Sequence, residues 1–414
     1  MVETLNTKPF YKGNIPSDWC ETKLGEESEL ITKGTTPTSI GCKFKDKGIN
    51  FIKIESLEEN GNIIADKVSF IDTETHNRLK RSQLRKNDIL ISIAGALGRI
   101  AIVSRDILPA NTNQALAIVR LKSVNKLELG FLFYYLNSPY IKKHIELINV
   151  QAAQANLSLA DISNFKIHYP PTTEQRAIVH ILSLMDSAIN KNNQLIAQKE
   201  LQIKWLMQNL LTAKKRLKGS YGEWKELHIR DISKEVSIRN REDKQLTVLS
   251  CTKYDGLVPS LEYFGRKIYS DDVSTYKIVP INHFAYATNH IEEGSIGYQE
   301  KFAEALISPM YTIFMTDDTV NDIFFYKLLK SHQLIYEYNA RMEGSIDRRG
   351  GLRWDAFSII KIKLPSYEEQ AAIAQVLQVA DKEINILKTK TEKLREQKKG
   401  MMQVLLTGKK RLKI

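Results

Sequence analysis

Two segments of the chain repeat hydrophobic residues at alternating steps of four and three positions. Both segments consist of residues that favour helices, interrupted only by Gly400 and Gly408, and neither has an internal proline. A 3.5-residue period is typical of helices that pair in a left-handed coiled coil. The pattern predicts two long helices, at residues 170–219 and 364–414. The two seams are Ile178, Leu182, Met185, Ile189, Asn192, Ile196, Lys199, Ile203, Leu206 and Leu210, and Ile373, Leu377, Ala380, Ile384, Leu387, Thr391, Leu394, Lys398, Met401 and Leu405.

The two seams can pair with each other. If the helices run antiparallel with Ile178 opposite Leu405, then Asn192 faces Thr391. Such a polar match could fix the register at some cost in stability, and cysteines at these two positions would then cross-link. The alternative is that each seam packs against its own neighbouring block or mediates self-association, as amphipathic helices commonly do.

An internal repeat organises the whole chain at an offset of 195 residues. Residues 206–218 (LMQNLLTAKKRLK) lie over residues 401–413 (MMQVLLTGKKRLK) with ten identities in thirteen positions, which excludes chance. The same ungapped register pairs residues 174–175, Glu-Gln, with residues 369–370, also Glu-Gln. Each half is therefore a strand-rich block, which differs between the halves, followed by a similar helix.

Two similar units joined by antiparallel helices give one chain an approximate two-fold axis. Dimeric DNA readers use this symmetry to meet two half-sites. A helix of about 35 residues spans roughly 50 Å, so the helices could hold the blocks over separate stretches of one duplex. The length of the helices would then set the distance between the two blocks.

Charge and composition narrow the class of partner. The chain has 60 Lys and Arg against 48 Asp and Glu, a formal net charge of +12, which suits a nucleic acid or an anionic membrane. A membrane is the weaker choice, because the N-terminus lacks an apolar core and the longest apolar stretch, residues 89–103, is broken by Gly95, Gly98 and Arg99. Three dispersed cysteines predict no disulfide framework and fit a reducing cytoplasm.

Catalytic motifs are not found in the sequence. Residues 169–172, Tyr-Pro-Pro-Thr, lack the polar and aromatic members that hold a flipped adenine. No phosphate-binding Gly-x4-Gly-Lys loop is present, and the glycines of residues 95–98 are interpreted as a tight turn between strands. The eight histidines are scattered, and Asp18, Glu21 and Lys23 form only a common surface pattern. The sequence therefore predicts no catalytic residue and no metal site.

The order of these motifs resembles the type I restriction-modification specificity (S) subunit. Trp19 and Trp224 open the two blocks, PPTTEQRAI and LPSYEEQAAI enter the helices, and a Leu-Leu-Thr-x-Lys-Lys-Arg-Leu string closes each helix. The first block also contains KGTTP and KNDILISIAGALGRIAIV. The resemblance covers essentially the full chain.

This resemblance implies a mixed α/β fold with two target-recognition domains, at residues 1–169 and 220–363, and an antiparallel coiled coil of two long helices. It also implies a non-catalytic cytoplasmic chain without a cofactor of its own. Its partners would be double-stranded DNA, two adenine methyltransferase subunits that use S-adenosylmethionine, and two restriction subunits that use ATP and Mg²⁺. Because the two blocks differ, they should read different half-sites of an asymmetric two-part target.

Candidate DNA-binding residues lie in polar stretches of the two blocks, where amides, hydroxyls and cations could contact bases or phosphates. In the first block they are Lys33, Thr35, Thr36, Asn111, Asn113, Gln114, Gln151, Gln154 and Asn156. In the second block they occupy loop-like stretches and are Lys253, Tyr254, Asn289, His290, Arg341, Arg348 and Arg349.

The basic strings at residues 214–216 and 409–411 have two interpretations of equal weight. They could neutralise DNA phosphates, or they could oppose the dipole at a helix C-terminus. Two rival functions also remain. A coiled-coil scaffold with two lectin-like modules predicts no salt-sensitive DNA binding, and a self-sufficient enzyme predicts activity of the chain alone with ATP or S-adenosylmethionine.

Overall fold

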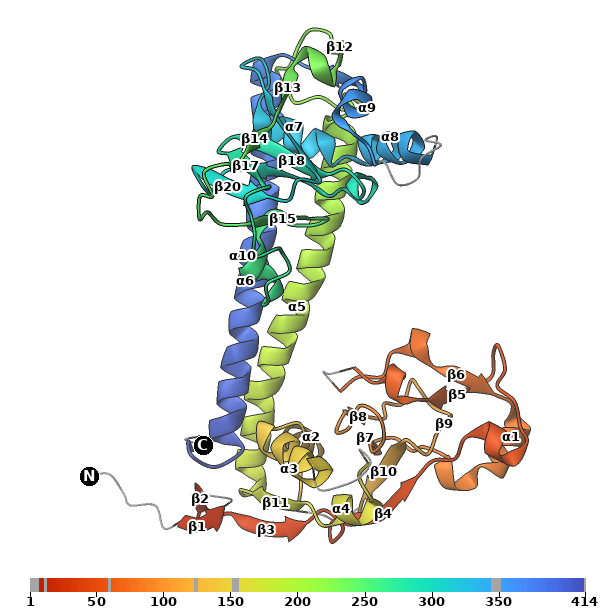
Figure 1. The fold of residues 1–414 in the computed structure, drawn as a ribbon. Coiled ribbons are helices and arrows are strands. Elements are labelled where there is room, and N and C mark those ends of the chain that lie inside the picture. Colours follow the sequence, from red (N-terminus) through yellow and green to blue (C-terminus); the bar gives the residue numbers. More distant parts are fainter. Residues whose placement is uncertain are drawn as a thin grey trace. The chain divides into compact units, whose positions relative to one another are not determined.

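The computed structural model describes residues 7–10, 13–58, 61–122, 126–150, 156–343 and 351–412. The chain divides into two compact units. The first unit comprises Met1–Asn193 and Thr389–Ile414, and the second comprises Gln194–Lys388. Two helices of 39 residues, α5 (Thr172–Leu210) and α10 (Tyr367–Leu405), contribute to both units (Figure 1).

The long helices end earlier than the sequence pattern predicts. Both carry good helix formers past Leu210 and Leu405, but Ala213 has φ 57° and Gly408 has φ 69°. A residue in this left-handed conformation ends a helix, and the chain turns there. The predicted ranges 170–219 and 364–414 are therefore too long at their C-terminal ends.

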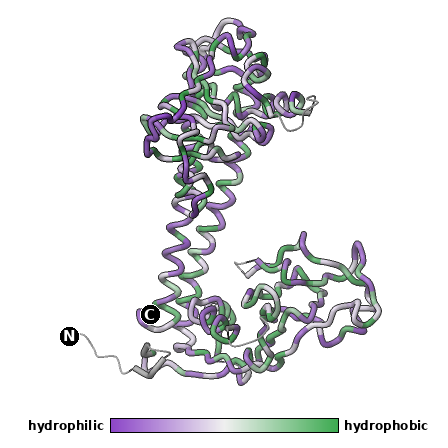
Figure 2. Tube along the Cα trace, viewed as in Figure 1, coloured by the Kyte–Doolittle hydropathy of each residue, from purple (hydrophilic) through white to green (hydrophobic). Residues whose placement is uncertain are grey.

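The seam residues are the inward face of α5 and α10. Every predicted seam position is buried or partly buried, and Figure 2 shows hydrophobic and hydrophilic residues alternating along both helices. In the first unit Ile178 shares a core cluster with Leu405. In the second unit Leu210 shares one with Ile373. Because both clusters also contain residues of the neighbouring block, the two interpretations of the seam each hold in part.

Ion pairs give the direction of the helices within each unit. In the first unit the Lys398 ammonium lies 2.6 Å from the Asp186 carboxylate, and in the second Lys199 lies 2.9 Å from Glu383. Together with the shared clusters of Ile178 and Leu405 and of Leu210 and Ile373, these pairs show that one helix ascends as the other descends, so the helix segments are antiparallel in each unit. The first pair puts Asn192 and Thr391 at nearly the same level, as predicted. However, Asn192 Nδ2 is buried without a hydrogen-bond partner, so this amide nitrogen adds no hydrogen bond to the register.

The first unit is built around a four-stranded antiparallel sheet with the order β4-β10-β7-β8. Its other strands form a hairpin (β1-β2), a two-stranded pair (β3-β11) and a three-stranded sheet (β6-β5-β9) in which β5 and β9 run parallel. The strands are β1 (Thr7–Phe10), β2 (Gly13–Pro16), β3 (Cys20–Lys23), β4 (Ser28–Lys33), β5 (Ile49–Ile52), β6 (Ser69–Ile71), β7 (Ile89–Ser92), β8 (Ile100–Ile102), β9 (Ala110–Thr112), β10 (Leu116–Leu121) and β11 (Lys166–Tyr169). Its shorter helices are α1 (Thr73–Arg78), α2 (Leu129–Leu136), α3 (Pro139–Val150) and α4 (Leu159–Ser163).

The second unit has an equivalent four-stranded antiparallel sheet, β13-β21-β18-β19. Beside it lie the pair β12-β22, the antiparallel sheet β14-β17-β20 and the hairpin β15-β16. The strands are β12 (Lys225–His228), β13 (Ser233–Val236), β14 (Ile238–Arg239), β15 (Leu249–Thr252), β16 (Gly256–Pro259), β17 (Lys277–Pro280), β18 (His283–Ala287), β19 (Ile296–Gln299), β20 (Glu304–Ile307), β21 (Tyr311–Thr316) and β22 (Lys361–Leu364). Its shorter helices are α6 (Ser260–Phe264), α7 (Asp322–Leu329), α8 (His332–Glu343) and α9 (Trp354–Ser358).

Each four-stranded sheet is covered on both faces, which explains why its central strands β7, β10, β18 and β21 are mostly apolar. In β7, Ile89 and Ile91 pack toward α2 and α3, while Leu90 packs toward β5 and β9. In β18, Phe284 packs toward α7, while Ala285 faces the cluster that contains β15, β17 and β20. A helical layer and a second strand layer therefore sandwich the sheet in each unit.

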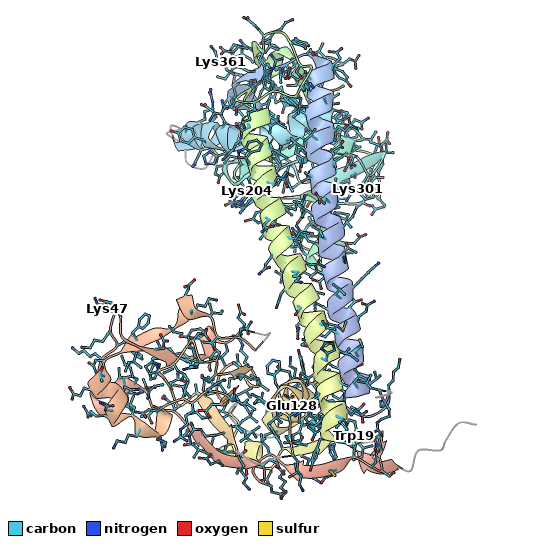
Figure 3. All side chains as sticks on the ribbon, turned by 180° about the vertical axis from the view of Figure 1, so that it is seen from behind. Trp19, Lys47, Glu128, Lys204, Lys301 and Lys361 are labelled. Atoms are coloured by element: carbon cyan, nitrogen blue, oxygen red, sulfur yellow. The ribbon has the colours of Figure 1, made fainter. Side chains whose placement is uncertain are left out.

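A shared frame recurs in both units: the four-stranded sheet, the strand pair that flanks it, three short helices and the start of a long helix. Trp19 and Trp224 precede the equivalent strands β3 and β12. Trp19 meets Phe131 edge-on at 6.5 Å between ring centroids, and Trp224 meets Phe324 in the same way at 6.2 Å. Figure 3 shows Trp19 near the end of α10. The tryptophans that open the two halves thus make matched contacts in the shared frame.

The repeated glutamine at each helix entry joins three segments of the frame. The Gln175 side chain accepts a hydrogen bond from Glu128 N at 2.8 Å and donates to Lys126 O and Pro170 O. Gln370 accepts from Asn321 N at 2.8 Å and donates to Thr319 O and Pro365 O. A buried amide that satisfies backbone groups in this way fixes the helix against the block.

The repeated glutamate at the start of each long helix pairs with the arginine of one of the basic strings that follow the helices. In the first unit Arg411 binds Glu174 at 2.6 Å and Asp18 at 2.8 Å. In the second unit Arg216 binds Glu369 at 2.6 Å. Both glutamates are buried. Each arginine therefore binds a carboxylate of its own unit, while Lys214, Lys215, Lys409 and Lys410 are exposed. For these lysines both interpretations remain predictions.

Candidate nucleic-acid interface

Two of the predicted polar stretches of the first block meet in space. Because β4 and β10 are paired, the residues that follow β4 lie beside those that precede β10. Thr35 N donates to Thr112 O at 3.1 Å, and the Thr36 hydroxyl donates to the Gln114 side-chain oxygen. Lys33 and Gln114 are exposed. This polar edge offers a cation, hydroxyls and an amide to solvent, the groups that contact phosphates and base edges.

Arg81 joins this edge, although the sequence analysis did not single it out. Its guanidinium donates to the Thr35 hydroxyl at 2.9 Å and is exposed. The sequence signal was the dense basic stretch at residues 80–86, which contains Lys80, Arg81, Arg85 and Lys86. A guanidinium that shares a surface with Gln114 extends the set of groups able to bind DNA.

Asn111 is a structural residue, so its prediction as a DNA contact is wrong. It lies in β9 and is 0% exposed. Its amide nitrogen donates to Leu79 O at 3.1 Å and to the Ser82 hydroxyl at 3.0 Å, and its oxygen bonds the His76 ring. With these partners satisfied inside the unit, the side chain cannot reach a duplex.

The other candidates of the first block have different outcomes. Asn113 is half-buried, and its side-chain oxygen accepts from Ala115 N at 3.2 Å, so it stabilises the turn before β10. Asn156 is exposed and forms an isolated bridge with Ala94. Gln151 and Gln154 lie outside the described residues.

In the second block Lys253 and Tyr254 form the tip of the β15-β16 hairpin. The Lys253 ammonium lies 5.5 Å from the centre of the Tyr254 ring, and the tyrosine is 81% exposed. An exposed aromatic ring beside a cation can stack on a base and neutralise a phosphate. Both residues remain candidates.

Asn289 and His290 are exposed in the loop between β18 and β19. Ligand atoms of His290, Glu292 and Glu293 lie within 4.8 Å of one another. Such exposed acidic groups are common and do not define a metal site on their own. The two carboxylates would repel a phosphate, so His290 is a weaker candidate than Tyr254.

Arg341 does not lie in a loop, contrary to the sequence interpretation. It occupies the last turn of α8, where its Nε lies 3.9 Å from the Glu337 carboxylate. Arg348 and Arg349 lie outside the described residues.

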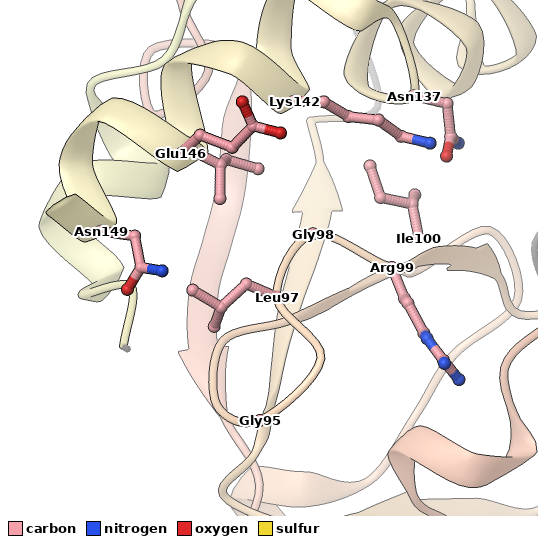
Figure 4. Close-up of a pocket in the computed structure, with 10 residues that line it drawn as sticks. Gly95, Leu97, Gly98, Arg99, Ile100, Asn137, Lys142, Glu146 and Asn149 are labelled. Atoms are coloured by element: carbon pink, nitrogen blue, oxygen red, sulfur yellow. The ribbon is translucent and has the colours of Figure 1, made fainter. Parts of the chain in front are cut away.

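The glycine-rich loop between β7 and β8 lines a pocket of about 390 Å³ in the first unit. Gly95 has φ 70° and Gly98 has φ 74°, which confirms the predicted tight turn. A Cβ at Gly98 would lie 2.9 Å from Ile145 of α3, so glycine permits the loop to approach this helix. Figure 4 shows Arg99 extending from the loop on one side, with Asn137 and Lys142 on the other.

The known proteins that resemble this chain share one description. Residues 16–201 match the family described as the type I restriction modification DNA specificity domain. The type I restriction enzyme EcoBI specificity subunit of Escherichia coli is 34% identical over 175 residues, which are 41% of this chain and 35% of that protein. The putative type I restriction enzyme MjaX specificity subunit of Methanocaldococcus jannaschii is 26% identical over 438 residues, covering 99% of this chain and 97% of that protein.

Solved structures agree in fold. The S subunit of a type I restriction-modification system from M. genitalium aligns with a TM-score of 0.57 at 15% identity. The alignment covers 96% of this chain and 98% of the S subunit chain. The HsdS subunit from Thermoanaerobacter tengcongensis aligns with a TM-score of 0.53 at 16% identity. The alignment covers 98% of this chain and 100% of the HsdS chain. The mixed α/β fold expected from the resemblance is confirmed.

These findings agree with one another, because the matching domain, the relatives and the solved structures are all described as specificity domains or subunits of type I restriction-modification systems. Residues 16–201 thus match the DNA specificity domain, and over nearly its full length the chain is similar to type I restriction-modification specificity subunits.

Proposed function

We propose that the chain reads an asymmetric two-part DNA target, with one half-site for each unit. One observation carries this proposal: the two units repeat the same frame but differ beyond it. The first adds a sheet with a parallel pair, β5 and β9, whereas the second adds an antiparallel sheet and a hairpin. Because bases are read by side chains at the contact surface, different surfaces on one frame suit two different half-sites.

In this proposal α5 and α10 form an antiparallel coiled coil along their whole length and act as a spacer. Each helix has 39 residues, which corresponds to roughly 58 Å. The internal repeat then gives one chain the two-fold arrangement by which dimers meet two half-sites. Helix length would set the number of unspecified bases between the half-sites.

We further propose that this chain is non-catalytic and that its partners perform the chemistry. It would recruit two adenine methyltransferase subunits, which use S-adenosylmethionine, and two restriction subunits, which use ATP and Mg²⁺, in the cytoplasm. The names of its relatives, which are specificity subunits of restriction enzymes, support this assignment. Among the described residues, no helix combines the length and the hydrophobicity needed to cross a membrane.

The experiment is co-expression of the full chain with its methyltransferase subunit, followed by single-molecule sequencing of methylated adenines in a host genome. We expect a gapped asymmetric motif. A variant with residues 225–364 exchanged for those of a related subunit should change one half of the motif only. As a control, Lys361→Ala removes an exposed cation of β22 that pairs with Glu226 and should leave the motif unchanged.

Two results would contradict the proposal. Methylation that does not depend on the chain would favour a scaffold with non-nucleic-acid modules, and such a scaffold should also lack salt-sensitive DNA binding. Methylation or cleavage by the purified chain alone would instead show a self-sufficient enzyme.

A further inference from the structure

Each unit has a groove between a helix-helix turn of the frame and the last turns of a long helix. In the first unit, residues around the α2-α3 turn and the C-terminal turns of α10 line a groove of about 1120 Å³, together with residues of α5, of the β7-β8 loop and of the segment after β5. It adjoins the pocket of Figure 4, with which it shares Arg99, Asn137, Lys142 and Glu146. In the second unit, the α7-α8 turn and the C-terminal turns of α5 line a groove of about 750 Å³.

The two grooves are equivalent under the internal repeat. Lys399 and Met402 line the first groove, and the residues 195 positions earlier, Lys204 and Met207, line the second. The turns correspond as well, because α2 and α3 each begin 193 positions before α7 and α8. Figure 3 shows Lys204 on α5. The helical sides of the two grooves therefore belong to the shared frame, whereas Leu57 and Glu58, which complete the first groove, come from the part that differs between the units.

Both grooves carry an excess of positive charge. Six cationic side chains and three carboxylates line the first, and one carboxylate, Asp186, is already bound by Lys398. Lys204, Lys214 and Lys330 line the second, and no carboxylate is found among the described residues that line it. Burial lowers the pKa of Lys330, so an anion beside it would favour its charged form. A concave surface with unneutralised cations attracts polyanions.

We propose that these two grooves bind DNA backbone phosphates and thereby hold each unit on the duplex independently of sequence. This inference rests on the proposed function. A feature that recurs in both units should contact something that recurs along the ligand, and phosphates recur whereas base pairs do not. A partner protein that bound both grooves would explain the recurrence equally well, but lysine is depleted in the buried parts of protein interfaces. The charge therefore favours phosphate.

The test compares two double variants of the full chain, each in complex with its methyltransferase subunit. Lys204→Ala with Lys214→Ala removes two cations of the second groove. Lys218→Ala with Lys382→Ala removes two exposed lysines of the same unit that do not line it. Dissociation constants are measured for a cognate and a scrambled duplex over a series of salt concentrations, and the methylated motif is mapped for each variant.

We expect the groove variant to weaken binding to both duplexes by a similar factor. Its slope of log affinity against log salt should fall by roughly 0.9 for each lost phosphate contact, while the control keeps the wild-type slope and both keep the motif. The retained motif shows that the alanine variant is folded, and restoration of the slope by Lys204→Arg with Lys214→Arg shows that charge is the cause.

Three results would overturn the inference. The groove variant could keep the control's slope, it could change the methylated motif, or it could lose the methyltransferase subunit without a change in slope. The last result would identify the groove as a protein-binding surface. If the wild-type complex itself prefers no duplex, the proposed function fails, and this outcome is distinct from an unaltered slope in a variant of a functional complex.

Discussion

The first and second units differ most in the strands that lie outside their shared frame. Near the helix ends, their contacts match almost residue for residue: a buried glutamine, a glutamate that binds an arginine, and a tryptophan against a phenylalanine. Farther away, the first unit presents the polar edge of Thr36 and Gln114, and the second presents the Tyr254 hairpin. One frame thus supports two dissimilar surfaces.

This difference separates two tasks that a DNA reader must perform. The matched contacts hold each block on its helices, and they do not require a particular surface elsewhere. The additional strands pack on the face of the four-stranded sheet opposite to the one covered by the short helices. They can therefore change without disturbing the frame, which would allow each unit to acquire a different DNA target.

The tryptophans should show the largest effect on stability. Trp19 is 1% exposed, whereas Trp224 is only half-buried. Trp19→Ala should lower the free energy of unfolding by about 4 kcal/mol and Trp224→Ala by about 2 kcal/mol, because the cost grows with the cavity that remains. Guanidinium denaturation of the full chain measures the loss, and hydrogen exchange assigns it to a unit. Equal losses would show that the two tryptophan sites are energetically the same.

The arginine at each helix end provides a second comparison. Arg411→Ala should cost about 2 kcal/mol, because it leaves the buried Glu174 carboxylate without its main partner. Arg216→Ala should cost less, since Arg411 also binds Asp18 whereas Arg216 has only backbone carbonyls as its additional partners. Denaturation of both variants gives the order. A larger loss for Arg216→Ala would contradict this ranking.

The left-handed residue after each helix should respond in opposite directions. Gly408→Ala should destabilise the first unit by about 2 kcal/mol, because φ is 69° and the new Cβ would lie 2.4 Å from the Pro16 ring. Ala213→Gly should stabilise the second by about 1 kcal/mol, because it relieves a φ of 57°. Shifts of the denaturation midpoint report both signs. Two shifts of the same sign would contradict the comparison.

The smallest effect concerns pH. The hydrogen bond from Arg411 holds the pKa of Asp18 below its usual value of 3.8. A lowered folded-state pKa contributes stability above pH 3.8, and this contribution is lost as the pH falls through the folded-state value. Asp18→Asn should therefore flatten the acid limb of stability in the first unit only. Hydrogen exchange at pH 3 and pH 7 measures it, with Lys361→Ala in the second unit as a control.

Several features could be predicted because they depend on neighbouring residues. The heptad seam identified the inward face of both helices, and Gly95 and Gly98 indicated the turn between β7 and β8. Arg81 was missed because its partner, Thr35, is 46 residues away. Asn111 was misread because a polar residue between apolar ones can face either solvent or a buried hydrogen-bond network, and its partners lie around residues 76–82.

The sequence by itself determined the repeat, the two long helices and the family resemblance, since these follow from periodicity and from motifs within short segments. Only the tertiary structure decided that Arg216 and Arg411 bind glutamates, that Asn111 is buried, and that equivalent basic grooves lie in the two units. These properties depend on contacts between residues far apart in the chain, and such contacts exist only after the helices and sheets have packed together.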